Sequence, residues 1–339
     1  SRGVYAVSSL SGGEVGVVPL VQVSAVDDSG VHRGNIEIGL PGVESGRIEL
    51  KAKNIYNQGI SGPTAQGGVL RTVSAGSNNT VPGGQDSILL DAAGDIGRNE
   101  PNGFINLVPV SIDGATKVHA HAGVGGATPA AQMALHFPVE ISHVTTSLLD
   151  LSVEGALGEA HVSAANSITV DSDFAPALGA IGLHAGQQNT EHPQPDSIIA
   201  VDDNRLLGGP TTASVRMEAG SVTLRAGSLV QALNQVDIEA LGSTEGTGNI
   251  ELAGTARVVS GDKIALHAEG SILGNTHTDG LFTQIEAPKV FLGARKNLYA
   301  HVDAAEIVAG DGPANLTGDG DLVDLVLTGT QATTLRGVG

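Results

Sequence analysis

The chain has 339 residues, including 48 Gly but no Cys or Trp, and only 2% of its residues are aromatic. Hydrophobic residues still make up 40%, mostly Val, Ile, Leu and Ala, so the material for a large core is available. This composition excludes a disulfide framework and a Cys-based metal site. It also excludes a membrane-spanning helix, because no apolar run approaches the roughly 20 residues that such a helix needs.

The formal net charge is −19, which would repel nucleic acids and anionic membranes. We therefore expect no nucleic-acid partner and no membrane insertion. The chain begins Ser1-Arg2-Gly3, with neither Met nor a signal peptide, so we expect a processed chain or an excised fragment. The lack of Cys suits an exported protein, although it fits any compartment.

Short strands with a period of two residues recur along the chain. Residues 34–38 read Gly-Asn-Ile-Glu-Ile, and closely similar segments return at residues 46–50 and 248–252. A longer form has apolar residues at i and i+2 and Ala at i+4, which places them on one face of a strand, with more polar residues between them. Its copies begin at Ile48, Ile88, Val215, Val222, Val236, Ile264 and Val290.

The spacing between these strands predicts a coiled repeat. The step from Val215 to Val236 has the same length as the step from Ile264 to Ile285. A coil of about 20 residues, built from two or three strands, would account for such steps. Gly227, Gly254 and Gly270 punctuate the strands, and we expect them to supply the positive φ of sharp corners.

These patterns predict an all-β fold, a parallel β-helix (β-solenoid) of roughly 15 coils. A single coil cannot bury its own apolar face, whereas stacked coils enclose a continuous aliphatic interior. An array of immunoglobulin-like sandwiches is the structural alternative, and it would need larger core aromatics. The only stretch approaching a helical pattern is 128–135, which Pro138 closes.

We expect residues 1–339 to form a single solenoid domain with two irregular loop insertions. The first lies near residues 57–85 and the second near residues 187–195, and both are rich in polar and turn-forming residues. Loops that project from a solenoid can carry a binding site or can be neutral surface.

The repeated pattern Ile-x-Leu-x-Ala-x-Gly-x-Ile-Gly resembles the shafts of filamentous-haemagglutinin-like bacterial surface adhesins. Residues 88–97 carry it, residues 264–274 carry it with one extra residue, and residues 215–230 carry a looser form. The resemblance implies a right-handed parallel β-helix, secreted to the bacterial cell surface. It specifies no single activity, because shaft repeats hold a molecule away from the cell. The Asn-Pro-Asn motifs of that family's secretion domain are missing, and the chain offers only Glu100-Pro101-Asn102-Gly103.

Polysaccharide lyases and hydrolases also use parallel β-helices, so carbohydrate binding or cleavage is the alternative function. Such sites place carboxylates on neighbouring coils for acid–base chemistry. The candidates are Asp171 with Asp173, which would share one face of a strand, and Asp202 with Asp203. The motifs of pectin-cleaving hydrolases and any aromatic cluster for stacking a sugar ring are missing. We therefore expect no enzymatic activity.

Two further groups of residues suggest metal ions. His119 and His121 would lie on one face of a strand and could hold a metal if a neighbouring coil added a ligand. Because Val118, Ala120 and Ala122 define the apolar face, we favour solvent-facing histidines. Three carboxylates near a loop have a composition that suits calcium, although they match no known calcium loop. They are Asp319, Asp321 and Asp324.

Both ends of the chain are strand-like, as in residues 1–23 and 322–327, and no amphipathic helix caps either end. Open strand edges pair with other chains, so we expect self-association head to tail through the rod ends. The sequence thus predicts an extracellular structural or adhesive solenoid, either a surface shaft or a filament subunit, with surface glycans or a receptor as further partners. A trimer resembling a phage tail spike would need a trimerisation region that the sequence does not show.

Overall fold

The computed structural model describes the chain in two compact units. Unit 1 comprises residues 1–139 and 147–162, and unit 2 comprises residues 140–146 and 163–339. The residues described are 20–26, 31, 34–39, 42–57, 68–72, 87–99, 106–107, 109–115, 117–125, 131–138, 143–154, 158–175, 179–186, 197–242, 247–274, 283–309, 323–327 and 334–337.

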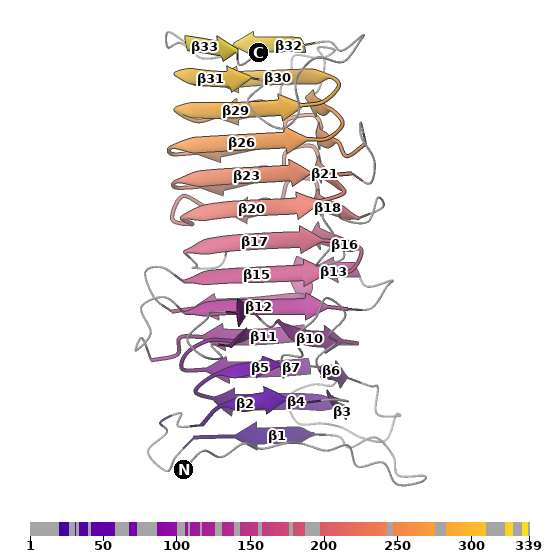
Figure 1. Ribbon diagram of the computed structural model, residues 1–339, viewed down its shortest axis with the longest axis vertical. Coiled ribbons are helices and arrows are strands. Elements are labelled where there is room, and N and C mark those ends of the chain that lie inside the picture. Colours follow the sequence, from indigo (N-terminus) through magenta and orange to yellow (C-terminus); the bar gives the residue numbers. More distant parts are fainter. Residues whose placement is uncertain are drawn as a thin grey trace. The chain divides into compact units, whose positions relative to one another are not determined.

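The described part of the chain is all-β with long parallel sheets, and one short 3-10 helix, η2 (Thr146–Leu148), is its only helix. This arrangement is consistent with a β-solenoid (Figure 1). No described helix is long and apolar enough to cross a membrane. An immunoglobulin-like array, whose sheets are antiparallel, does not agree with these pairings. The stretch nearest to a helical pattern, 128–135, is not a helix where it is described, because Gln132–Phe137 forms a strand.

Unit 1 contains three parallel stacks of strands and one short antiparallel pair. Its strands are β1 (Val21–Ser24), β2 (Ile36–Ile38), β3 (Gly42–Ser45), β4 (Arg47–Ala52), β5 (Ile55–Asn57), β6 (Val69–Thr72), β7 (Ser87–Ala92), β8 (Arg98–Asn99), β9 (Asn106–Leu107), β10 (Val110–Asp113), β11 (Lys117–Ala122), β12 (Gln132–Phe137) and β14 (Leu149–Val153). The stacks run β1-β4-β7-β11-β14, β3-β6-β10-β12 and β2-β5, and β8 pairs with β9 antiparallel. Single bridges continue the third stack from Ile55 to Ile96 and from Ile96 to Met133.

Unit 2 also has three parallel stacks. Its strands are β13 (His143–Thr145), β16 (Ser167–Val170), β17 (Ala180–Ala185), β18 (Ile198–Val201), β19 (Leu206–Gly208), β20 (Ser214–Ala219), β21 (Ser221–Leu224), β22 (Leu229–Ala232), β23 (Gln235–Ala240), β24 (Ile250–Leu252), β25 (Arg257–Ser260), β26 (Lys263–Ala268), β27 (Ile272–Gly274), β28 (Gln284–Glu286), β29 (Lys289–Ala294), β30 (Leu298–Asp303), β31 (Glu306–Ala309), β32 (Val323–Leu327) and β33 (Thr334–Gly337). β15 (Glu159–Ala164) begins in unit 1 and ends in unit 2.

Successive turns of the chain in unit 2 add one strand to each stack. The first stack runs β17-β20-β23-β26-β29-β31-β33, the second β13-β16-β18-β21-β24-β27-β30, and the third β19-β22-β25-β28. The third stack joins the second at β30, whose two ends pair with β27 and β28. β32 pairs with β30.

The predicted Ile-x-Leu-x-Ala motif stacks in register and forms aliphatic ladders, which are rows of apolar side chains running from strand to strand through each stack. Ile48 pairs with Ile88 in unit 1, and Val215 pairs with Val236 in unit 2. The Ala at the end of the motif also aligns in every copy except the one that begins at Val222, and the columns that these residues form are fully buried. In that copy Ala226 follows the end of β21 and is exposed, so the prediction there is wrong. Their members are Ala52, Ala92 and Ala122 in unit 1, and Ala219, Ala240, Ala268 and Ala294 in unit 2.

The coils differ in length more than the sequence predicts. Val215 pairs with Val236 and Val236 with Ile264, so the second of these two coils is longer than the first. The expected step from Ile264 to Ile285 is not a coil, since Ile264 pairs with Val290 and Ile285 belongs to another stack. The stretch near residues 57–85 contains a strand, β6, which pairs with β3 and β10. The stretch near residues 187–195 lies outside the described residues.

Polar side chains at the corners that precede strands accept hydrogen bonds from backbone N–H groups of the next coil. We call these side chains the corner ladder. In unit 2, Asn249 Oδ1 accepts the backbone N–H of Ser271 at 2.9 Å, and Ser271 Oγ accepts that of Asn297 at 3.2 Å. In unit 1, Asn54 Oδ1 accepts the N–H of Asp95 at 2.9 Å, and Asp95 Oδ1 accepts that of Gln132 at 2.8 Å. The ladder satisfies backbone donors where the chain turns from one stack to the next.

Glycines at corners act in two different ways. Gly227 (φ 71°) has the expected positive φ, and Asn204 (φ 57°) also occupies this left-handed region of φ. Gly254 (φ 54°) likewise agrees with the prediction. Gly270 does not adopt a positive φ, so the prediction there is wrong. It is needed for space instead, because a Cβ would lie 2.4 Å from Asn249 Oδ1.

Candidate functional site

The four aspartates of the carbohydrate-binding alternative lie at a corner of unit 2. β16 ends at Val170, so Asp171 and Asp173 follow the strand and do not share one of its faces, contrary to the prediction. Val170 pairs with Val201, so Asp171 and Asp202 each stand one residue beyond a paired position on neighbouring coils. The register therefore brings these two carboxylates to equivalent positions.

Protein groups already engage three of these carboxylates. Thr146 Oγ1 donates to Asp171 Oδ1 at 3.1 Å, and the backbone N–H of Leu206 donates to Asp173 Oδ1 at 3.1 Å. Arg225 Nη1 lies 3.0 Å from Asp202 Oδ1. Asp203 lies in the exposed turn after β18. These contacts fix a corner of the coil, which is a structural role.

The two predicted histidines lie on the outer face of β11, as favoured. Both are only partly exposed, while Val118, Ala120 and Ala122 between and beside them are fully buried. His119 Nδ1 lies 2.8 Å from Asp150 Oδ2 on β14, which accounts for that ring without a metal.

Of the predicted calcium ligands, Asp319 and Asp321 lie outside the described residues. Asp324 belongs to β32, and its backbone pairs with Tyr299. Within the part of the chain that the structure describes, no group of three His, Cys, Asp or Glu side chains could hold a metal ion. The calcium site stays a prediction.

One group of neighbouring ionisable side chains was not predicted as a site, and it lies on the outer surface of the first stack of unit 2. We call it the charged face, and it consists of His184 (β17), Arg216 and Glu218 (β20), Asp237 and Glu239 (β23), and Lys263 and His267 (β26). In β20, β23 and β26 every second residue is buried, so the intervening charged residues point outward together.

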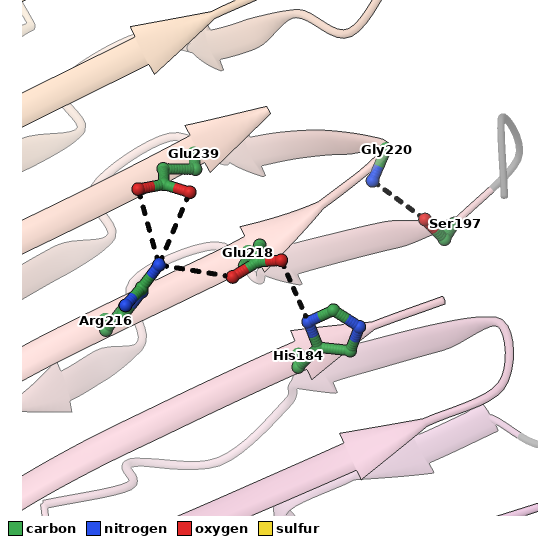
Figure 2. A network of polar contacts seen from close by, with 6 residues as sticks. All are labelled: His184, Ser197, Arg216, Glu218, Gly220 and Glu239. Carbon is green, nitrogen blue, oxygen red and sulfur yellow. Dashed lines mark hydrogen bonds and ion pairs between the residues drawn. The ribbon is translucent and has the colours of Figure 1, made fainter. Parts of the chain in front are cut away.

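Hydrogen bonds link three neighbouring strands across this face (Figure 2). Arg216 Nη2 lies 3.3 Å from Glu218 Oε2 and 3.4 Å from each carboxylate oxygen of Glu239. The other oxygen of Glu218 lies 3.4 Å from His184 Nδ1. One guanidinium therefore holds carboxylates from two strands, and His184 adds a third strand to the network.

The surroundings lower the pKa of Glu218 but raise the pKa values of Asp237 and Glu239. The hydrogen bond from His184 lowers the pKa of Glu218, with Arg216 adding to the effect. Burial raises the pKa of Asp237 and that of Glu239 against the attraction of Arg216. Glu218 also raises both of them through repulsion.

Register alone creates this face, which explains why sequence reasoning did not single it out. Glu218 pairs with Glu239, and Arg216 pairs with Asp237, although the partners are a whole coil apart in the chain. The signal that could have found them is the repeat itself, because the step from Val215 to Val236 aligns the polar residues of one strand with those of the next.

Comparison of the chain with protein-family models, with curated proteins and with solved structures finds no match in any of the three. Function must therefore be argued from the chain itself.

Proposed function

We propose that this protein is an extracellular structural or adhesive β-solenoid, a surface shaft or the subunit of a self-associating filament. The observation that carries the proposal is the set of in-register aliphatic ladders in each unit, such as Ile48 with Ile88 and Val215 with Val236. Parallel strands stacked in this way give length and rigidity, because every internal strand has a backbone partner on both sides. These properties suit a shaft, which needs no reacting residues.

The finer architecture belongs to the same proposal. A right-handed β-helix of roughly 15 coils follows from the handedness of parallel crossovers and from the length of the chain. The organisation as one domain over residues 1–339 stays a prediction. The haemagglutinin-like character rests on the repeated motif, whose copies at Ile88 and Ile264 both form buried, parallel-paired strands. A bacterial cell-surface location is the setting that this resemblance implies.

Self-association would use strand edges. Among the described strands, β1 pairs only with β4, and β33 pairs only with β31. Ala25 N–H bonds Lys51 O at 2.8 Å, and alternate residues of a strand direct their N–H groups to opposite sides. Ser24 N–H therefore points away from β4, toward any added strand. An edge of this kind accepts a second copy head to tail, a contact that propagates without closing.

Electron microscopy and sedimentation of the chain over a range of concentrations test the proposal. We expect rods that lengthen as the concentration rises. Ser24→Pro removes an outward donor and should shorten the assemblies, whereas the matched control Ser24→Ala should leave them unchanged. A strict monomer at high concentration would refute the filament version. Glycan-coated and receptor-bearing surfaces then serve to test adhesion.

A carbohydrate-binding or carbohydrate-cleaving β-helix is the second candidate, and one observation favours it. Asp171 and Asp202 stand at equivalent positions on neighbouring coils, which is how carboxylates are supplied in such sites. Asp202→Asn and Asp203→Asn should then abolish glycan binding or turnover. If binding survives both changes, these aspartates belong to the scaffold, as the ion pair of Asp202 with Arg225 suggests.

A further inference from the structure

The in-register pairing of strands β20 and β23 in unit 2 brings two carboxylates together. Glu218 and Glu239 are direct partners in the register of β20 and β23. Paired parallel strands lie about 4.8 Å apart, and like charges directly opposite each other weaken the pairing. Arg216 Nη2 is the group that contacts both carboxylates (Figure 2). The arrangement holds two negative charges on one guanidinium.

A third carboxylate adds to this excess. Asp237 lies opposite Arg216 in the register, yet within the described residues it makes no ion pair. Ionisable groups on both neighbouring strands act on Asp237 and Glu239: Arg216 and Glu218 on β20, and His267 on β26. Lys263 on β26 also acts on Asp237, and Asp237 itself acts on Glu239. Lys263 Nζ also lies 4.8 Å from the centre of the Phe291 ring.

We propose that the charged face is a proton-dependent lock, in which proton uptake by Asp237 and Glu239 strengthens the stacking of β20, β23 and β26 on acidification. The lock is a property of unit 2 and does not depend on what the protein binds. It would make these coils more stable in acidic surroundings than at neutral pH.

The direction follows from linkage between protonation and folding. Burial raises the pKa of Asp237 and of Glu239, so the folded chain binds protons that the unfolded chain has released. Their stabilising effect is therefore present at acidic pH and is lost as the pH rises through the folded-state pKa. Glu218 acts oppositely, because its pKa is lowered, and its contribution disappears only when the pH falls below its ordinary value of about 4.3. As the pH falls from neutral, Asp237 and Glu239 therefore take up protons before Glu218 does.

Amide variants of the full chain test the lock by thermal unfolding at pH 7.5 and pH 5.0. Asp237→Asn and Glu239→Gln remove the unfavourable charges, so each should raise Tm by about 1–2 °C at pH 7.5 and by less at pH 5.0. Glu218→Gln should lower Tm at both pH values, because this carboxylate is stabilised in its charged form.

Glu251→Gln on β24 is the matched control for net charge, since Glu251 is exposed and lies in the same unit. It should change Tm equally at both pH values. If Glu251→Gln gives the same pH-dependent gain as Glu239→Gln, the effect is general repulsion and the proposal is wrong. It is also wrong if the two β23 variants lower Tm at pH 7.5, or if their gain is the same at both pH values.

A direct readout avoids variants altogether. Carbon-13 NMR titration of the side-chain carboxyls in the wild-type chain should place the midpoints of Asp237 and Glu239 above their ordinary values of about 3.9 and 4.3, and that of Glu218 below 4.3. Ordinary midpoints for Asp237 and Glu239 would overturn the proposal even if every variant failed to fold.

Discussion

Removing one acceptor of the corner ladder, by Asn249→Ala, should destabilise unit 2 by about 1–2 kcal/mol. Asn249 Oδ1 accepts the backbone N–H of Ser271 at 2.9 Å, at a partly buried corner. The substitution leaves that donor without its partner, which costs about 1–3 kcal/mol for a buried group. The lower part of this range applies because water can reach a partly buried corner. For a unit of this size the loss corresponds to a fall in Tm of about 2–8 °C.

The assay is thermal unfolding followed by circular dichroism, with hydrogen exchange at the Ser271 amide as a local readout. Asn249→Asp is the matched control, because it keeps an oxygen at the same place. Asp95 plays this part in unit 1, where its Oδ1 accepts the N–H of Gln132 at 2.8 Å. We expect the Asp variant to retain most of the stability and the slow exchange. If Asn249→Asp is as damaging as Asn249→Ala, the acceptor is not the cause and the reasoning fails.

Three further changes probe the core, a corner and one ionisable group. Ile238→Ala removes most of a fully buried side chain and should lower the free energy of unfolding in urea by about 3–4 kcal/mol. Ile238→Val should lower it by about 1 kcal/mol, and equal losses would contradict the packing of the aliphatic ladder. Gly227→Ala should cost about 1–2 kcal/mol in thermal unfolding, because φ is 71° and the new Cβ would lie 2.3 Å from Asn204 Oδ1. Gly209→Ala is the control: its new Cβ would meet nothing closer than 3.8 Å, so its stability should be nearly unchanged. Burial raises the pKa of Tyr56, so the wild type should lose stability relative to Tyr56→Phe as the pH rises above about 10. In the ultraviolet titration of tyrosinate, the difference between the wild type and Tyr56→Phe should show that Tyr56 ionises late.

The strands could be predicted from the sequence because side-chain alternation depends only on neighbouring residues. The Ile88 motif and the Ile264 motif are both buried strands for that reason. The coil lengths could not be predicted, because they depend on how many residues each corner takes. Ile264 and Ile285 illustrate the difference, since the spacing that joins Val215 to Val236 within one stack leads here to a different stack.

The candidate site was predicted only in part. Asp171 and Asp202 do stand at equivalent positions, which adjacent carboxylates in the sequence suggested only indirectly. The pairing of Glu218 with Glu239 required the register, and a register is set by all of the buried residues of two strands together. Local sequence identifies which residues face outward, but it does not say which of them meet.

Uneven coils raise the question of what keeps each strand in register, and the charged face supplies part of the answer. A slip of one residue in β23 would turn Asp237 and Glu239 into the aliphatic interior and expose Val236 and Ile238. Burying two unpaired carboxylates costs far more than the repulsion that they meet on the outside. The same residues that weaken the correct pairing at neutral pH thus exclude the incorrect one. The corner ladder acts in the same sense, because the bond from Ser271 N–H reaches Asn249 Oδ1 only when the coils are aligned. Coil length is then free to vary at the corners while the stacked strands stay fixed.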